Sequence, residues 1–232
     1  MKFSRMFGKG FVTVTRFVPS FTKYVPLSKK LAWEVVGGLS NPSKMPCKGY
    51  SIPASTCKMG SLMRKNPNTI CAKCYAHKGM YVFPNVKRAL MRRFKSLSHP
   101  LWESSMVALI KGTDYFRWHD SGDIQSVEHL RSIANVVSRT PDTLHWLPTR
   151  EYNIVSEYIK VYDAFPGNLV VRLSATKFNG AAPLALASKL GVNASGASAT
   201  NFDCPASLQE GKCGSCRKCW SHMNFQVNYK KH

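Results

Sequence analysis

The first hundred residues contain almost no acidic side chains. Glu34 is the only carboxylate among them, against 19 lysine and arginine residues, whereas residues 101–232 carry 14 basic and 11 acidic side chains. A segment that basic repels itself unless it meets a polyanion, and nucleic acid is the commonest one. The charge distribution therefore predicts a nucleic-acid partner. Attraction to an anionic membrane surface, or solubility alone, are the alternative explanations.

The sequence also lacks a long uninterrupted apolar run. In residues 1–30, basic side chains repeatedly interrupt the phenylalanines and valines, so no signal-peptide core is expected there. No span approaches the roughly 20 apolar residues that a membrane helix needs. We therefore expect a cytoplasmic protein without membrane contact, in which cysteines stay reduced.

Cysteine is absent from the 129 residues between Cys74 and Cys204. The eight cysteines instead form two groups of four, and each group contains cysteines separated by two residues. Thiolates at that spacing on a tight turn can converge on one metal ion or on an iron-sulfur cluster. The predicted metal ligands are Cys47, Cys57, Cys71 and Cys74 in the first group, and Cys204, Cys213, Cys216 and Cys219 in the second.

The spacing within the second group favours iron over zinc. Cys213, Cys216 and Cys219 place three thiolates in seven residues, which is the rhythm of ferredoxin loops, whereas zinc ribbons usually pair two CxxC turns. The first group offers one CxxC turn and two outlying members. We expect two [4Fe-4S] clusters, with structural zinc as the alternative.

The central part of the chain alternates strands with helices. Strands are predicted at 115–118, 144–147 and 169–173, each followed by a polar tip and an amphipathic helix. This alternation is typical of an α/β fold built from parallel βα units, as a partial or complete barrel. Cysteine-rich metal-binding segments would lie near both ends of this scaffold.

Three regions follow from this reading. Residues 1–30 form a basic and aromatic arm, 31–190 an α/β core that includes the first cysteine group, and 191–232 a linker with a C-terminal cysteine knot. Within them, 31–36 is expected to be a short strand, 191–200 a mobile linker because of its small residues, and 224–232 a final strand.

The polar tips of the three strands should meet, because parallel strands end at one edge of the sheet, where ligands bind in α/β folds. Local capping is the usual role of any single residue there, and Asp123 in particular could cap the helix that starts near Ser126. As a group, the tips predict a polar crevice. Its candidate proton carriers are His119, Asp120, Asp123 and Glu151, and its candidate substrate contacts are Arg117, Arg150, Arg172 and Ser174.

The segment 85–97 has helical spacing and no acidic residue. A solvated face explains its charges as well as a phosphate contact does, but the missing acids favour the contact. The candidate nucleic-acid ligands are Lys87, Arg88, Arg92 and Arg93.

Several of these motifs together resemble the bacteriophage family called Gene product 88, over about residues 40–232. The motifs are residues 71–76, 116–123, 146–151, 168–174 and 213–220. The resemblance implies a phage protein, hence a host cytoplasm as its location and a host protein as a further partner. It implies no particular reaction.

A metal loop ahead of βα units also resembles, more distantly, the radical S-adenosylmethionine enzymes. In those enzymes three cysteines bind a cluster and leave one iron open for the cofactor. The compact CxxxCxxC is absent here, the interval from Cys57 to Cys71 is long, and no Gly-Gly-Glu follows. If Cys47 is a fourth ligand, the first site is closed; if it is not, one iron is open and S-adenosylmethionine is a candidate cofactor.

Two functions follow from these observations. The first is an iron-sulfur protein that binds or acts on nucleic acid, or on a nucleotide-like anionic substrate, by redox or radical chemistry. The second is a zinc-stabilised protein without enzymatic activity that binds nucleic acid or a host factor.

Overall fold

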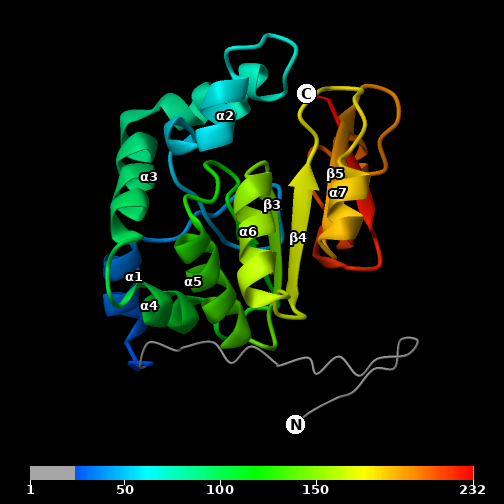
Figure 1. Ribbon diagram of the computed structural model, residues 1–232. Helices are drawn as coiled ribbons and strands as arrows, with labels where there is room; N and C mark the ends of the chain where they lie inside the picture. The colour runs from blue at the N-terminus through cyan, green and yellow to red at the C-terminus, as the bar shows by residue number, and fades with distance from the viewer. Residues whose placement is uncertain (1–23, 232) are drawn as a thin grey trace, which may run out of the picture.

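The computed structural model describes residues 24–231, and the core of these is one parallel β-sheet (Figure 1). Its strands are β1 (Gly49–Tyr50), β2 (Tyr115–Trp118), β3 (Leu144–Thr149), β4 (Leu169–Ser174), β5 (Asn193–Ser198) and β6 (Gln226–Lys230). The helices are α1 (Lys29–Val36), α2 (Lys58–Met63), α3 (Pro84–Ser96), α4 (Trp102–Ile110), α5 (Val127–Ser138), α6 (Tyr152–Tyr162) and α7 (Leu184–Lys189).

The strands lie in the sheet in the same order as in the sequence, from β1 to β6, and every neighbouring pair is parallel. This confirms the predicted α/β fold with parallel βα units. Sequential order is what repeated right-handed crossovers produce when each helix returns over the same face. Within residues 24–231, β1 and β6 are the two edges of the sheet and do not pair, so these strands form an open sheet and not a closed barrel.

The helical face of the sheet holds the main hydrophobic core. Phe116 and Trp118 of β2, Leu147 of β3 and Val171 of β4 pack there against buried residues of α4, α5 and α6. These side chains alternate along their strands with residues of the opposite face, as a strand period of two requires. The core therefore fixes the ends of β2, β3 and β4 relative to one another.

The opposite face of the sheet is covered by the C-terminal cysteine-rich segment. The indole of Trp220 packs edge-on against Trp146 of β3 and Tyr115 of β2, with ring centroids 5.3 and 5.5 Å apart, and its Nε1 donates to the Phe116 carbonyl over 3.0 Å. The sheet is thus buried on both faces, as parallel sheets are.

Two sequence-based predictions of local structure are wrong. Residues 31–36 belong to helix α1, because Ser28 caps its first turn by accepting from the Leu31 amide over 3.3 Å, and Gly37 ends it in the left-handed region. Residues 193–198, expected to be a linker, form β5 between β4 and β6. The final strand is confirmed as β6.

The predicted basic arm at residues 1–30 falls largely outside the described residues, which begin at 24. Within residues 24–231, no helix has both the length and the hydropathy that crossing a membrane requires.

Candidate functional site

The carboxyl ends of β2 and β3 are tied together by Asp123. Its carboxylate accepts from the Thr149 hydroxyl over 2.6 Å, from the Arg150 amide over 3.0 Å and from the Ile124 amide over 2.8 Å. Burial raises the pKa of Asp123 to about 6, although these hydrogen bonds act in the opposite direction. Asp123 does not cap α5; Ser126 does, by accepting from the His129 amide.

Glu151 connects the same edge to the first cysteine segment. It is buried, and its Oε1 accepts from the backbone amide of Met59, the second residue of α2, over 2.8 Å. Arg150 reaches the next strand, because its Nε donates to the Ala175 carbonyl just beyond β4. The tips of β2, β3 and β4 therefore meet, as the topology predicts, and α2 lies beyond the end to which the β4 arrow points (Figure 1).

Three cysteines gather at this edge. The sulfurs of Cys57 and Cys71 lie 3.6 and 3.8 Å from the point where Gly60 would carry a Cβ atom, so both border one small space. Cys74 is near enough to raise the pKa of each of these two thiols, after the larger effect of burial, and Asp123 and Glu151 act in the same direction. The segment is anchored to the sheet by the Ile70 amide, which donates to the Thr176 carbonyl over 2.9 Å.

Cys47 lies with the second cysteine group and not with the first. Burial raises the pKa of the Cys47 thiol to about 12, and Cys213 is close enough for its charge to act in the same direction. The backbone explains this position, because the Cys213 amide donates to the Lys44 carbonyl over 2.9 Å. The sequence-based grouping of Cys47 with Cys57, Cys71 and Cys74 thus differs from the spatial arrangement.

The second group sits against the non-helical face of the sheet. The Cys216 amide donates to the Cys213 carbonyl over 3.0 Å, and the Cys204 amide donates to the Asn228 carbonyl of β6 over 3.1 Å. The Cys219 sulfur lies 3.3 Å from the Tyr229 hydroxyl. Burial raises the pKa of Cys219 to about 11, with Arg172 and Arg117 opposing the rise.

All eight cysteines are free thiols. As the side chains stand in residues 24–231, no group of three or more cysteine, histidine, aspartate or glutamate side chains is arranged to hold a metal ion. The first set nevertheless supplies the thiol donors that a soft metal ion needs, and Gly60 lets them approach closely, because a Cβ there would lie only 2.8 Å from the Cys57 Cβ. Burial raises the pKa of the Cys57 and Cys71 thiols and so keeps them protonated, and metal binding would release these protons.

His119 and Asp120 lie beside this cluster. His119 is buried at positive φ (53°), neither ring nitrogen has a hydrogen-bond partner, and burial lowers its pKa well below 6.5. Its ring packs edge-on against that of His129. Asp120 accepts from the hydroxyls of Tyr75, at its carbonyl, and Tyr81, at its Oδ2. Strained backbone of this kind concentrates at functional sites.

One of the predicted substrate contacts lies elsewhere. Arg172 is fully buried and spends all five guanidinium N–H groups on backbone carbonyls of Lys218, Cys219, Ser221, Asn224 and Ala194, which leaves none for a substrate. Arg117 lies on the non-helical face over the Trp146 ring, where Tyr75 and Asp120 raise its pKa against the effect of burial. Ser174 stays at the end of β4, where its carbonyl accepts from the Tyr152 hydroxyl.

The predicted basic helix face is divided. Lys87, Arg88 and Arg92 of α3 are exposed. Arg93 is buried, and it donates from Nε and Nη2 to the carbonyls of Gly38 and Leu39 over 3.0 and 2.9 Å. Only the first three could contact a phosphate, because Arg93 joins α3 to the end of α1.

Sequence reasoning missed several residues that build the site. Gly60, Tyr75 and Tyr81 carry no spacing signal, and only the fold brings them to the strand ends. Thr149 could have been found, because it stands in the polar tip of β3 next to Arg150.

The sequence profile of one family, described as Gene product 88, matches residues 25–222. No curated protein and no solved structure matches the chain. The match covers most of the chain, including both cysteine groups up to Cys219 and every strand except β6. The chain therefore belongs to the Gene product 88 family, as the resemblance of its motifs predicts.

Proposed function

We propose that this protein is an iron-sulfur protein whose reactive centre is held by Cys57, Cys71 and Cys74, and that it acts on nucleic acid or a nucleotide-like anionic substrate. One observation carries the proposal: the three thiols gather beside two buried carboxylates, Asp123 and Glu151, at the carboxyl ends of parallel strands. That edge is where α/β folds bind ligands.

The position of Cys47 supports an open site. Because Cys47 lies near Cys213, the first set contains three cysteines, and a centre with three protein ligands keeps a position for an external ligand. An iron-sulfur cluster bound there would supply one-electron or, with S-adenosylmethionine on the open iron, radical chemistry. The thiols would have to turn toward the space beside Gly60 to bind it.

The neighbouring side chains suit proton transfer and anion binding. Asp123, with a pKa near 6, can hold a proton or lose it close to neutral pH, and Glu151 lies beside it. His119 is neutral, so either of its unpartnered ring nitrogens can take part in a proton transfer. The guanidinium of Arg150 uses Nε on Ala175 and offers its Nη groups to an anionic substrate.

A nucleic-acid substrate is favoured by charge. The first hundred residues carry 19 basic side chains and one acid, and they include the first cysteine segment. The exposed residues Lys87, Arg88 and Arg92 of α3 extend this charge along the helix that follows it. Neutralising phosphates with such side chains releases counterions and attracts a polyanion over a long range.

The alternative is a zinc-stabilised binding protein without enzymatic activity, acting on nucleic acid or a host factor. The second cysteine group favours it. Arg172 and Trp220 join residues 218–224 to the sheet, so four closed thiolates there would serve the fold. Structural zinc sites are closed in this way.

Anaerobic purification followed by iron, sulfide and zinc analysis and a visible spectrum tests the proposal. We expect a brown protein from which Cys71→Ala removes the iron of one cluster and Cys216→Ala that of the other. Cys47→Ala should leave the first cluster intact, so S-adenosylmethionine binding, measured by equilibrium dialysis, should survive it and fail in Cys71→Ala.

A colourless protein with stoichiometric zinc would rule out the redox and radical mechanisms. If Cys47→Ala removed the same iron as Cys71→Ala, Cys47 would be the fourth ligand and the first site would be closed.

A further inference from the structure

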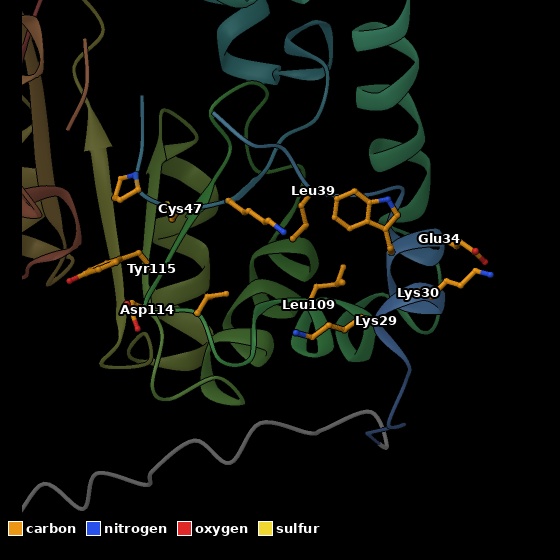
Figure 2. A pocket seen from close by; sticks show the side chains of 12 residues that line it. Lys29, Lys30, Glu34, Leu39, Cys47, Leu109, Asp114 and Tyr115 are labelled. Atoms are coloured by element: carbon orange, nitrogen blue, oxygen red, sulfur yellow. The ribbon is translucent and has the colours of Figure 1, made fainter. Parts of the chain in front are cut away.

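A cavity of about 630 Å³ opens at the other end of the sheet, away from the strand tips. It lies between α1, the end of α4 and the residues that precede β1 and β2, as Figure 2 shows. Leu39, Pro46 and Leu109 supply apolar lining, and Trp33 stands among them. The volume falls in the range of small-ligand sites, about 300–1,000 Å³.

Trp33 is an exposed aromatic platform in this cavity. Its side chain is 44% exposed although it sits in a short helix that packs on α4. Gly38 holds the ring from one side: a Cβ on that glycine would lie 3.1 Å from the indole carbons. The Trp33 carbonyl also accepts the Gly38 amide over 2.9 Å, so the end of α1 is closed tightly beneath the ring. The platform is therefore pre-organised.

Three lysines line the cavity. Lys29 and Lys30 come from the first turn of α1, and Lys48 Nζ lies 5.9 Å from the Trp33 ring centroid. Two carboxylates also line the cavity: Glu34 on the same side as Lys30, and Asp114 at the start of β2 on the opposite side (Figure 2). An anionic group would consequently sit toward Lys29 and Lys48, away from Asp114 on one side and Glu34 on the other.

We propose that this cavity binds a nucleobase and its phosphate from a single-stranded nucleic acid. The base would stack on Trp33 in place of the Lys48 ammonium, because stacking of a base contributes more than an exposed cation–π contact does. Lys29, Lys30 and the released Lys48 would then meet the phosphates. A duplex is a poor occupant, because proteins read duplexes by inserting elements into their grooves, whereas a concave pocket admits an unstacked base.

Cys47 also lines this cavity, but the site is separate from the proposed reactive centre. It lies at the amino ends of β1 and β2, whereas the thiols of Cys57, Cys71 and Cys74 lie at the carboxyl ends. The bound nucleic acid would be held at the amino ends of the β-strands. A single strand of sufficient length would extend from there to the carboxyl ends. Loss of binding at Trp33 and loss of metal at Cys71 are separate measurements, so either inference can fail alone.

Fluorescence anisotropy with a labelled oligothymidine or oligouridine of about 12 nucleotides tests the proposal. Trp33→Ala should weaken binding by roughly fivefold to a hundredfold, and Trp33→Phe, which keeps a stacking face, should recover most of the loss. The double variant Lys29→Gln/Lys30→Gln should lower the slope of log affinity against log salt by about 0.7 per lysine.

The matched control removes two exposed lysines elsewhere, as Lys160→Gln/Lys189→Gln, and should leave the affinity and the salt slope close to those of the natural chain. Unchanged binding in Trp33→Ala with retained metal content would overturn the proposal, as would an equal loss in the control. Tighter binding of a duplex than of the single strand would overturn it too. If a mononucleotide displaced the labelled oligonucleotide at a similar concentration of phosphate, the cavity would be a nucleotide pocket. The assignment to single-stranded nucleic acid would then be wrong.

Discussion

Arg117 is a half-buried cation that forms no ion pair with a carboxylate. Among the described residues, ion pairs join only Lys212 to Glu210 and Lys218 to Asp203. The guanidinium of Arg117 instead stacks 4.4 Å from the Trp146 ring centroid. The charged groups that act on it include the Asp120 carboxylate and, more weakly, Cys219, and it lowers the pKa of Cys47 and Cys213. Burying a charge costs several kcal/mol unless it is compensated. A set of metal-bound thiolates beside it would add to the negative charge that Asp120 supplies.

Replacing this charge should therefore weaken the second metal centre. We expect Arg117→Met to lower the metal affinity of the Cys204, Cys213, Cys216 and Cys219 set by roughly tenfold. Residues that contact metal ligands without binding the metal themselves have effects of this size. Competition with a chelator on the purified protein measures the change. Arg88→Met removes an exposed arginine of α3 and should have no effect; an equal effect of both variants, or none of Arg117→Met, would argue against compensation.

At the scale of elements, Arg172 is the main connection between β4 and the C-terminal segment. Lysine keeps its charge but has three donors in place of five and no planar fork. Arg172→Lys should leave at least two buried carbonyls unsatisfied, at about 1–3 kcal/mol each. Urea unfolding should show a loss of about 2–5 kcal/mol, and hydrogen exchange should increase in residues 218–230 before it increases in α5. A loss below about 0.5 kcal/mol would contradict this role.

The alternation of strands and helices could be predicted because each βα unit carries its own pattern. The two failures have local causes. Helix α1 is short, and its signals were the caps at Ser28 and Gly37, not its apolar residues. Strand β5 has small residues because its neighbours are close: a Cβ on Gly196 would lie 2.3 Å from the Asn228 side chain. Composition suggested a linker where packing requires small side chains.

The convergence of Asp123, Arg150 and Glu151 could be predicted from topology, since parallel strands share one edge. The position of Cys47 could not. It depends on the pairing of β1 with β2 and on the hydrogen bond from Cys213 to Lys44, which join segments far apart in the sequence. Spacing along the chain groups cysteines that are neighbours in sequence, and it carries no information on such long-range contacts.

At the scale of the whole molecule, the layer of helices over the sheet buries two histidines, His129 and His145. His145 of β3 is fully buried, stacks on Trp118 and shares a 2.9 Å hydrogen bond with Thr140. His129 of α5 packs edge-on against Trp102. Burial lowers the pKa of His145 to about 3 and that of His129 to about 4. Both are therefore neutral in the folded protein at every pH above these values.

The folded protein should consequently lose stability as the pH falls below about 6.5, because the unfolded chain then binds protons that the folded chain excludes. Each histidine contributes a slope of about 1.4 kcal/mol per pH unit, down to about pH 4 for His129 and about pH 3 for His145, and nothing above about pH 6.5. His145→Gln should remove its share of this slope, whatever its effect on stability at neutral pH. Urea unfolding at several pH values between 6.5 and 4.5 measures it.

Metal loss on acidification affects both proteins alike and cancels in the difference. The exposed control His99→Gln should leave the slope unchanged; an unchanged slope in His145→Gln would mean that this histidine is already protonated, or solvated, in the folded state.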